Sequence, residues 1–262
     1  KVYPQQHEKN GDILVVCIAD FHYGLLSTKY STGHDYNLEI AEECFYYAIN
    51  DIINRVRGRK FEKVLFVVGN DFLNFDNIDG LTTRSTPQDN CSPWFDIVNK
   101  AKELIINGID MLTIAPISVC YVPSNHDLHT MFGIMNTISA WYRNDEDVEV
   151  DKSPLSRKYC KVGETLLCLS HDIKIKNALK VITTEAKDQW SESNNVICLL
   201  AHLHQAMIYE KQGCLEIYRL PSFSGWSRWS NSMAFVQTEK KAQSFIINNK
   251  LGITDVINTI IK

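Results

Sequence analysis

One pattern recurs along this chain: a short apolar run ends abruptly in side chains that can bind a metal ion. Residues 64–68 show it most clearly, because valine, leucine and phenylalanine are followed directly by Gly69, Asn70 and Asp71. A continuous apolar run of this length predicts a strand that is buried on both faces. Open α/β sheets bind their ligands beyond the carboxyl ends of such strands. Asp71 is therefore predicted to face a site.

Four further apolar runs end in the same way. They are residues 13–19, 117–122, 166–169 and 196–200, and they are followed in turn by Asp20 and His22, by Asn125, His126 and Asp127, by His171, and by His202 and His204. A lone histidine after a strand is more often a hydrogen-bonded loop or core residue. Five such runs in one chain predict that these side chains converge at one edge of the fold.

The donors at that edge are carboxylates, an amide and imidazoles, without a thiolate. This mixture suits manganese first, with iron, zinc or magnesium as further options. The seven candidate ligands are Asp20, His22, Asp71, Asn125, His171, His202 and His204. They would serve two divalent metal ions if Asp71 bridged the pair. Two ions about 3.5–4 Å apart can clamp a phosphate and activate water for phosphoester hydrolysis.

Composition limits the classes of protein that remain. Eight cysteines are scattered without a C-x-x-C pair, which indicates small core residues in a reducing compartment. The net charge of −4 gives no overall basic surface, so nucleic acid would have to be bound by local patches or metal ions. No apolar stretch is long enough to span a bilayer, and we expect a cytoplasmic protein without membrane contact. The first residue is lysine, which indicates a fragment or processed form and leaves an upstream domain open.

The periodicity predicts an α/β fold, a four-layer αββα sandwich of two mixed β-sheets flanked by helices. A strand at 13–19, a helix at 36–53 and a strand at 63–69 form a right-handed βαβ unit. Further helices are predicted at 94–106, 130–141 and 175–190, and short strands of the second half at 159–162, 206–210, 215–220, 234–237 and 243–247. We expect residues 1–11 to be a linker or tail and residues 12–262 to be one catalytic domain.

An irregular polar segment separates residue 74 from residue 93. Loops of this length in a compact domain are usually functional or disordered. One interpretation is a substrate-facing flap with Arg84 as a phosphate clamp. A surface loop without that role fits the sequence equally well.

The five polar clusters resemble, in order, the five sequence blocks of calcineurin-like metallophosphoesterases. The matching segments are 20–22, 69–71, 124–127, residue 171 and 201–204, and the resemblance covers about residues 12–248. It implies the metallophosphoesterase fold and two metal sites that share Asp71. Asp20, His22 and His204 would complete one site, and Asn125, His171 and His202 the other. His126 would stand free of the metals and assist the leaving group, with Asp127 orienting its imidazole.

Finer features are similar to the double-strand-break repair exonuclease branch and to phage-encoded relatives. Asn70 lies inside the Gly-Asp block as in that branch, and the segments 82–89 and 219–222 are similar to the phage proteins. This supports Arg84 as a substrate contact and is compatible with a phage-infected host cell. Asn74 stands where the branch has a histidine. An asparagine can hydrogen-bond a phosphate but cannot transfer a proton, which predicts slower exonuclease action.

The leading hypothesis is a two-metal phosphodiesterase that acts on DNA as an exonuclease-like nuclease. An alternative is a small or cyclic nucleotide phosphodiesterase or phosphatase, which the acidic composition favours. A third is a non-catalytic binding module stabilised by its metals. The sequence leaves a homodimer open, and it does not fix metal identity or strand polarity.

Overall fold

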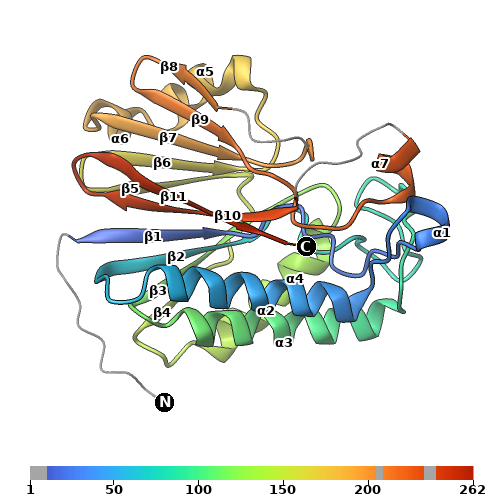
Figure 1. The fold of residues 1–262 in the computed structure, drawn as a ribbon. Helices are drawn as coiled ribbons and strands as arrows, with labels where there is room; N and C mark the ends of the chain where they lie inside the picture. The colour runs from blue at the N-terminus through green and yellow to red at the C-terminus, as the bar shows by residue number, and fades with distance from the viewer. Residues whose placement is uncertain (1–10, 205–208, 233–239, 262) are drawn as a thin grey trace.

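The computed structural model describes residues 11–204, 209–232 and 240–261, and it contains two β-sheets with helices on their outer faces (Figure 1). The first sheet has the strand order β11-β10-β1-β2-β3-β4. Its strands are β1 (Asp12–Cys17), β2 (Phe61–Gly69), β3 (Ile117–Val122), β4 (Val148–Asp151), β10 (Lys241–Asn248) and β11 (Gly252–Ile260). β1 to β4 are parallel, whereas β10 is antiparallel to both of its neighbours.

The second sheet has the strand order β5-β6-β7-β9-β8. Its strands are β5 (Arg157–Val162), β6 (Thr165–Ser170), β7 (Asn195–Leu200), β8 (Tyr209–Gln212) and β9 (Leu215–Arg219). β6, β7 and β9 are parallel, and the edge strands β5 and β8 are antiparallel to their neighbours. Parallel strands end at the same edge of a sheet, so β6 and β7 deliver their following loops to one place.

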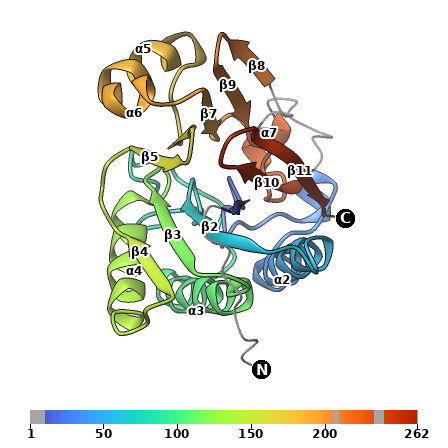
Figure 2. The ribbon, with the colours of Figure 1, turned by 90° about the vertical axis from the view of Figure 1, so that its left-hand side faces the viewer.

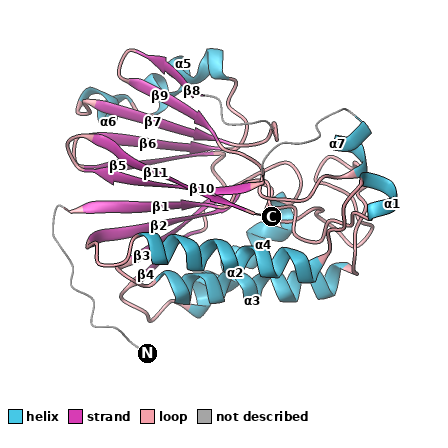
Figure 3. Ribbon diagram, in the orientation of Figure 1, coloured by secondary structure: helices cyan, strands magenta, loops and turns pink. Residues whose placement is uncertain are grey.

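Helices cover the outer face of each sheet (Figure 3). They are α1 (Lys29–Thr32), α2 (Leu38–Arg55), α3 (Trp94–Leu112), α4 (Leu128–Trp141), α5 (Ile175–Glu185), α6 (Lys187–Ser191) and α7 (Arg228–Ser232). In the turned view, α2, α3 and α4 lie on one side of the molecule, and α5 and α6 lie on the other (Figure 2). The short helices α1 and α7 stand at the loop end, beside each other.

Successive side chains of a strand point to opposite faces of the sheet, so each strand contributes to two separate cores. On β1, Leu14 and Val16 pack with the helices α2 to α4, while Val15 and Cys17 pack against the second sheet. A third cluster joins the outer face of the second sheet to α5 and α6. Each buried valine, leucine or isoleucine contributes about 1.5–3 kcal/mol relative to an exposed one. The predicted fold class, two mixed sheets flanked by helices in four layers, is confirmed.

The helix α2 shows how the sequence determines its element. The Asn37 side chain caps its start by accepting a hydrogen bond from Ile40 N at 3.0 Å. The apolar stripe then recurs at helical spacing, and its buried members are Ala41, Phe45, Ala48, Ile49 and Ile52. This stripe packs α2 onto the first sheet and against α3.

The two halves of the chain do not build one sheet each. β10 and β11 come from the end of the chain but join the first sheet, because β10 pairs with β1 from Ile13 to Cys17. β4 and β11 were not anticipated, and the helix predicted at 175–190 is divided into α5 and α6 at Ala186. The predicted strand 234–237, most of the strand 206–210 and residues 1–10 of the predicted tail lie outside the described residues.

None of the helices in the described ranges combines the length and the apolar composition that a bilayer crossing requires.

Two helical glycines provide a matched test of the packing. A Cβ at Gly108 of α3 would lie 2.8 Å from Cζ of the buried Phe45, whereas a Cβ at Gly133 of α4 would meet nothing within 4 Å. Gly108→Ala should lower the free energy of unfolding by about 1–3 kcal/mol through overpacking. Gly133→Ala should raise it by about 0.5–1 kcal/mol through helix propensity. Urea denaturation measures both, and a stabilised Gly108→Ala protein would contradict the α2–α3 contact.

Candidate metal centre

The end of β2 turns sharply so that Asp71 enters the site. Gly69 has a φ of 95°, and a Cβ there would lie 2.2 Å from Val122 O on the neighbouring strand. Only glycine fits this position. The next two residues, Asn70 and Asp71, also have positive φ angles, of 53° and 59°. The peptide N–H of Asp71 is held by Ser124 Oγ at 2.7 Å.

Backbone strain is concentrated at the predicted ligands. Within the described residues, seven non-glycine positions have a positive φ, and five of them are predicted ligands: Asp20 (48°), His22 (45°), Asp71 (59°), His202 (79°) and His204 (49°). Such a conformation costs about 1–3 kcal/mol at each residue and persists only where the surrounding structure holds it. The fold therefore maintains these side chains against a local preference.

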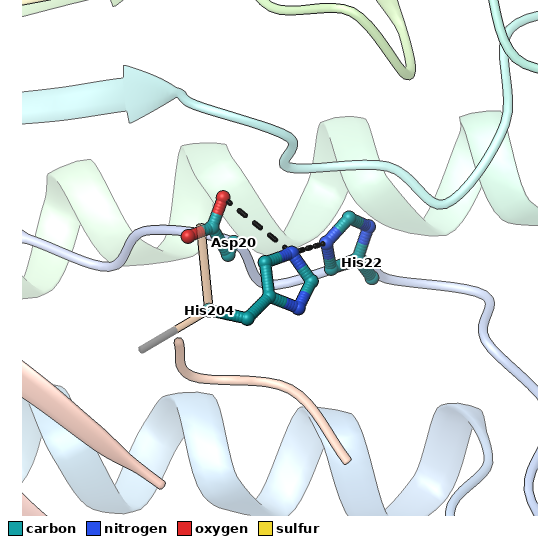
Figure 4. A group of neighbouring side chains, drawn as sticks. All are labelled: Asp20, His22 and His204. Atoms are coloured by element: carbon teal, nitrogen blue, oxygen red, sulfur yellow. Dashed lines mark hydrogen bonds and ion pairs between the residues drawn. The ribbon is translucent and has the colours of Figure 1, made fainter. Parts of the chain in front are cut away.

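The first group of donors is formed by Asp20, His22 and His204 (Figure 4). His22 Nε2 lies 2.9 Å from His204 Nε2, which in turn lies 3.9 Å from Asp20 Oδ1. Asp20 and His22 follow β1 of the first sheet, while His204 follows β7 of the second. The separation of the two imidazole nitrogens is compatible with both binding one ion at bond lengths of about 2.0–2.1 Å.

The second group surrounds Nε2 of His171. This nitrogen lies 2.8 Å from Asn125 Oδ1, 3.0 Å from His202 Nδ1 and 3.1 Å from Asp71 Oδ2. A single imidazole N–H can satisfy only one of these neighbours. A cation could accept a lone pair from all four groups. The structure thus brings Asp71, Asn125, His171 and His202 together as the sequence predicted.

Asp71 connects the two groups. It belongs to a cluster with His171 and His202 and also to one with His22 and His126, and the ligand atoms of each cluster lie within 4.8 Å of one another. Its Oδ2 faces His171, while Oδ1 accepts a hydrogen bond from His126 N at 3.0 Å. This is the placement that a bridging carboxylate requires.

The protonation states of the imidazoles suit cation binding. Burial lowers the pKa of His22 and His202, and it lowers the pKa of His204 to about 4. These rings are therefore neutral at pH 7, with a lone pair available to an ion. Nδ1 of His22 and Nδ1 of His171 have no hydrogen-bond partner among the described residues, so each ring makes its polar contacts through Nε2.

The two carboxylates of the site are both buried. Burial acts to raise the pKa of Asp71, but the charge and hydrogen bond of His171 outweigh it and hold this pKa well below its usual range. Burial raises the pKa of Asp20 to about 7. Burial would lower the pKa of His171, but Asp71 raises it to about 9. Imidazoles, an amide oxygen and two buried carboxylates are a donor set that fits divalent cations.

His126 lies beside both groups, and its ring is held from the backbone. Its Nδ1 lies 2.9 Å from Asn74 O. Because a carbonyl oxygen only accepts, Nδ1 carries the proton and Nε2 is the atom left for a ligand or substrate. The ring centroid of His126 is 4.5 Å from that of His22.

The prediction that Asp127 orients the His126 imidazole is wrong. Its oxygens accept hydrogen bonds from Ser124 Oγ and from Leu73 N, both at 2.7 Å. Burial raises the pKa of Asp127 to about 7, with a further contribution from the charge of Asp71. Asp127 therefore stabilises the backbone segment directly after Asp71 through its hydrogen bond to Leu73 N.

Asn74 was predicted to contact substrate, and it lines the cavity beside the donors, where that role stays a prediction. Its amide nitrogen donates to Asp89 O at 3.1 Å and to Asn90 Oδ1 at 2.7 Å, so both N–H groups are used within the protein. Asn74 thereby ties the segment after β2 to residues 89–90, and its backbone oxygen positions His126. Arg84 is exposed at the rim of the pocket and makes no hydrogen bond or ion pair within the described chain. Its role as a phosphate contact stays a prediction.

Sequence reasoning missed the contribution of Ser124. Its hydroxyl accepts a hydrogen bond from Asp71 N and donates one to Asp127 Oδ1. A hydroxyl directly before Asn125 at a strand end was the available signal, since serine readily bonds nearby backbone groups.

The donors open into a cavity of about 560 Å³. It is lined by His22, Asp71, Asn125, His126, His202 and His204, and by residues of the segments 82–89 and 224–227. Arg228, directly after the second segment, forms an ion pair with Asp89 of the first at 2.9 Å. Loop segments therefore complete the lining of the cavity.

The sequence matches no protein-family model and no curated protein. Solved structures resemble it over nearly its whole length. A single mutant of Vps29 from Entamoeba histolytica has a TM-score of 0.41 and 14% identity, covering 95% of this chain and 99% of that one. An archaeal phosphodiesterase has a TM-score of 0.43 and 8% identity, covering 95% and 99%. A predicted phosphoesterase from Streptococcus pneumoniae has a TM-score of 0.31 and 13% identity, covering 96% and 98%.

Asp71→Asn tests the shared carboxylate. It should weaken the binding of both ions, whereas Asp20→Asn should weaken only one. The loss of Mn²⁺ affinity should exceed the roughly 10- to 100-fold loss that follows substitution of a residue hydrogen-bonded to a metal ligand. Titration calorimetry of the metal-free protein with Mn²⁺, together with elemental analysis, measures affinity and stoichiometry. Asp110→Asn is the control, because this carboxylate accepts a hydrogen bond from Tyr142 Oη and belongs to neither group of donors. Two ions bound to Asp71→Asn at unchanged affinity would exclude a bridge.

Proposed function

We propose that this protein is a two-metal phosphodiesterase of the calcineurin-like metallophosphoesterase superfamily, with residues 12–262 as the catalytic domain and DNA as the substrate. The observation that carries the proposal is the meeting of seven donors from five strand ends, in the order of the family's sequence blocks, with Asp71 shared between two groups. Manganese is the metal that we expect first.

The seven donors would form two metal sites. Asp20, His22 and His204 would hold one divalent ion, and Asn125, His171 and His202 the other, with Asp71 between them. When bound, such a pair supplies the positive charge and Lewis acidity that phosphodiester hydrolysis requires. The neutral rings of His22, His202 and His204 and the low pKa of Asp71 keep these groups ready for that role at pH 7.

His126 is the candidate proton donor. Phosphodiester cleavage leaves an alkoxide that needs a proton. The hydrogen bond to Asn74 O keeps the Nδ1 proton in place, so a second proton must be carried on Nε2. A protonated His126 can release this proton to the leaving oxygen. Because His126 lines the cavity, it can do so beside the donors.

The shape of the cavity supports an exonuclease-like action. A volume of about 560 Å³ lies within the range of about 300–1,000 Å³ that suits a single small ligand. A cavity of this size accommodates one nucleotide unit at the end of a strand, not the body of a duplex. The exposed Arg84 at the rim would contact the next phosphate.

The same cavity also favours a second candidate, a small or cyclic nucleotide phosphodiesterase. A free nucleotide fills the space without requiring a surface that follows a strand. The net charge of −4 agrees with this candidate, because strand binding depends on positive charge.

A substrate panel separates these candidates. Single-stranded DNA, duplex DNA, cyclic nucleotides and bis-p-nitrophenyl phosphate are incubated with the Mn²⁺-loaded protein. DNA hydrolysis supports the proposal, turnover of cyclic nucleotides alone supports the second candidate, and tight metal binding without any hydrolysis supports a binding module. His126→Gln should lower kcat by about 10²- to 10⁴-fold with the metal content unchanged. His129→Gln is the control, because this ring bonds Asp76 outside the donor groups.

Arg84→Ala should raise KM for DNA about tenfold with little change in kcat, because a charged hydrogen bond to a phosphate distant from the reacting centre is lost. Steady-state kinetics on a single-stranded oligonucleotide measures both parameters. Arg143→Ala removes a guanidinium that bonds Ala140 O on α4 and serves as the control. An unchanged KM in Arg84→Ala would remove Arg84 from the substrate contacts.

A further inference from the structure

Arg219 is a buried cation at the end of β9, close to the metal centre. Only 5% of it is exposed. Its Nη1 donates to Ala201 O at 2.9 Å, and its Nε has no hydrogen-bond partner within the described part of the chain. No carboxylate among the described residues forms an ion pair with it. A guanidinium in such surroundings is costly to bury. The contacts of Arg219 should therefore show what role this buried cation has.

The peptide between Ala201 and His202 is held at both of its polar atoms. Its oxygen accepts the hydrogen bond from Arg219, and its N–H donates to Asp20 Oδ1 and Oδ2 at 3.2 and 3.1 Å. A cation thus lies at one end of the peptide dipole and a carboxylate at the other. Each strengthens the hydrogen bond of the other by polarising the peptide.

This same peptide begins a strained turn. Leu203 N donates to Ala201 O at 3.1 Å, and His202 between them has a φ of 79°. A hydrogen bond from residue i to i+2 around a positive φ is a rare and strained form of γ-turn. The turn directs His202 Nδ1 toward His171 Nε2, 3.0 Å away. Arg219 bonds the acceptor oxygen of this turn.

The residues after Arg219 continue from the second sheet to the first. Leu220 N donates to Leu200 O at 2.6 Å, and Phe223 N donates to Ala19 O at 3.0 Å. Asp20 O accepts hydrogen bonds from Ser222 Oγ at 3.1 Å and from Ser224 N at 3.2 Å. Residues 219–224 therefore join the ligand loop after β7 to the ligand loop after β1.

We propose that Arg219 is a positioning residue of the metal centre. Its guanidinium fixes the Ala201–His202 peptide, and this peptide sets both the His202 ring and the Asp20 carboxylate in the geometry that binds cations. The inference rests on the metal binding in the proposed function and not on its substrate. Arg219 itself contacts neither the ions nor the substrate.

The charges agree with this geometry. Burial lowers the pKa of Arg219, and Asp20 is the foremost charge that opposes the shift. In return, Arg219 is one of the groups that favour the ionised form of Asp20 against its burial. Arginine remains cationic even when its pKa is lowered, which lysine in the same place would not ensure.

The test measures metal affinity, so it does not depend on hydrolysis. Metal-free wild type, Arg219→Met and Arg219→Gln are titrated with Mn²⁺ by calorimetry. Arg219→Met should weaken binding by about 10- to 100-fold, the range for residues that orient a ligand. Arg219→Gln loses the charge but retains an N–H donor, and its affinity should fall between the other two. Wild-type affinity in Arg219→Met would overturn the proposal.

Lys158→Met controls for the loss of a buried cation as such. Lys158 is 7% exposed and is held by Ser153 and Asp151 away from the donor groups. Its replacement should lower the unfolding temperature but leave Mn²⁺ affinity unchanged, and an equal loss of affinity in both variants would contradict a positioning role. If circular dichroism shows Arg219→Met to be unfolded, Arg219→Gln decides, and wild-type affinity there overturns the proposal. Wild type that binds Mn²⁺ but hydrolyses nothing would refute the proposed function alone.

Discussion

Asp20 and Asp71 are both buried within one site, and the burial of two carboxylates close together is the constraint on which the rest of this structure depends. Each would be costly to bury alone. Imidazoles compensate in part, since His171 bonds Asp71 directly. Burial keeps the rings of His22 and His204 neutral, so they leave negative charge for a cation to balance. The strained backbone, the glycine at residue 69 and the hydroxyl of Ser124 all serve to hold this unfavourable arrangement.

The centre also depends on the packing of the two sheets. Asp20, His22 and Asp71 belong to loops of the first sheet, whereas His171, His202 and His204 belong to loops of the second. The cluster that contains Val15 and Leu199 lies between the sheets and sets their separation. Residues 219–224 then connect the two groups of loops by hydrogen bonds. A cation bound by both groups would link the sheets further, so metal binding and sheet packing are expected to stabilise each other.

A second network connects the flap to the helix that follows His126. Asp76 is buried and accepts hydrogen bonds from Thr130 N, from Thr83 Oγ1 and from His129 Nδ1. Thr130 lies in the first turn of α4, where an acidic side chain satisfies free N–H groups and the helix dipole. The segment that bears Arg84 is thereby fixed to α4, and Asn74 fixes its other end. The segment that bears Arg84 is therefore held to the rest of the fold by hydrogen bonds at both of its ends.

The sequence by itself determined the strands that end in polar clusters, the helices α2, α3 and α4, and the seven donors, because apolar periodicity and residue chemistry are local properties. Tertiary structure alone decided that β10 and β11 join the first sheet, since strand pairing between distant segments depends on the register of β1 with β10 and leaves little local signal. It also decided the roles of Asp127, Asn74 and Ser124. Their hydrogen-bonding groups could serve a substrate or the backbone equally well, and only the folded chain brought Leu73, Asp89 and Asp71 within their reach.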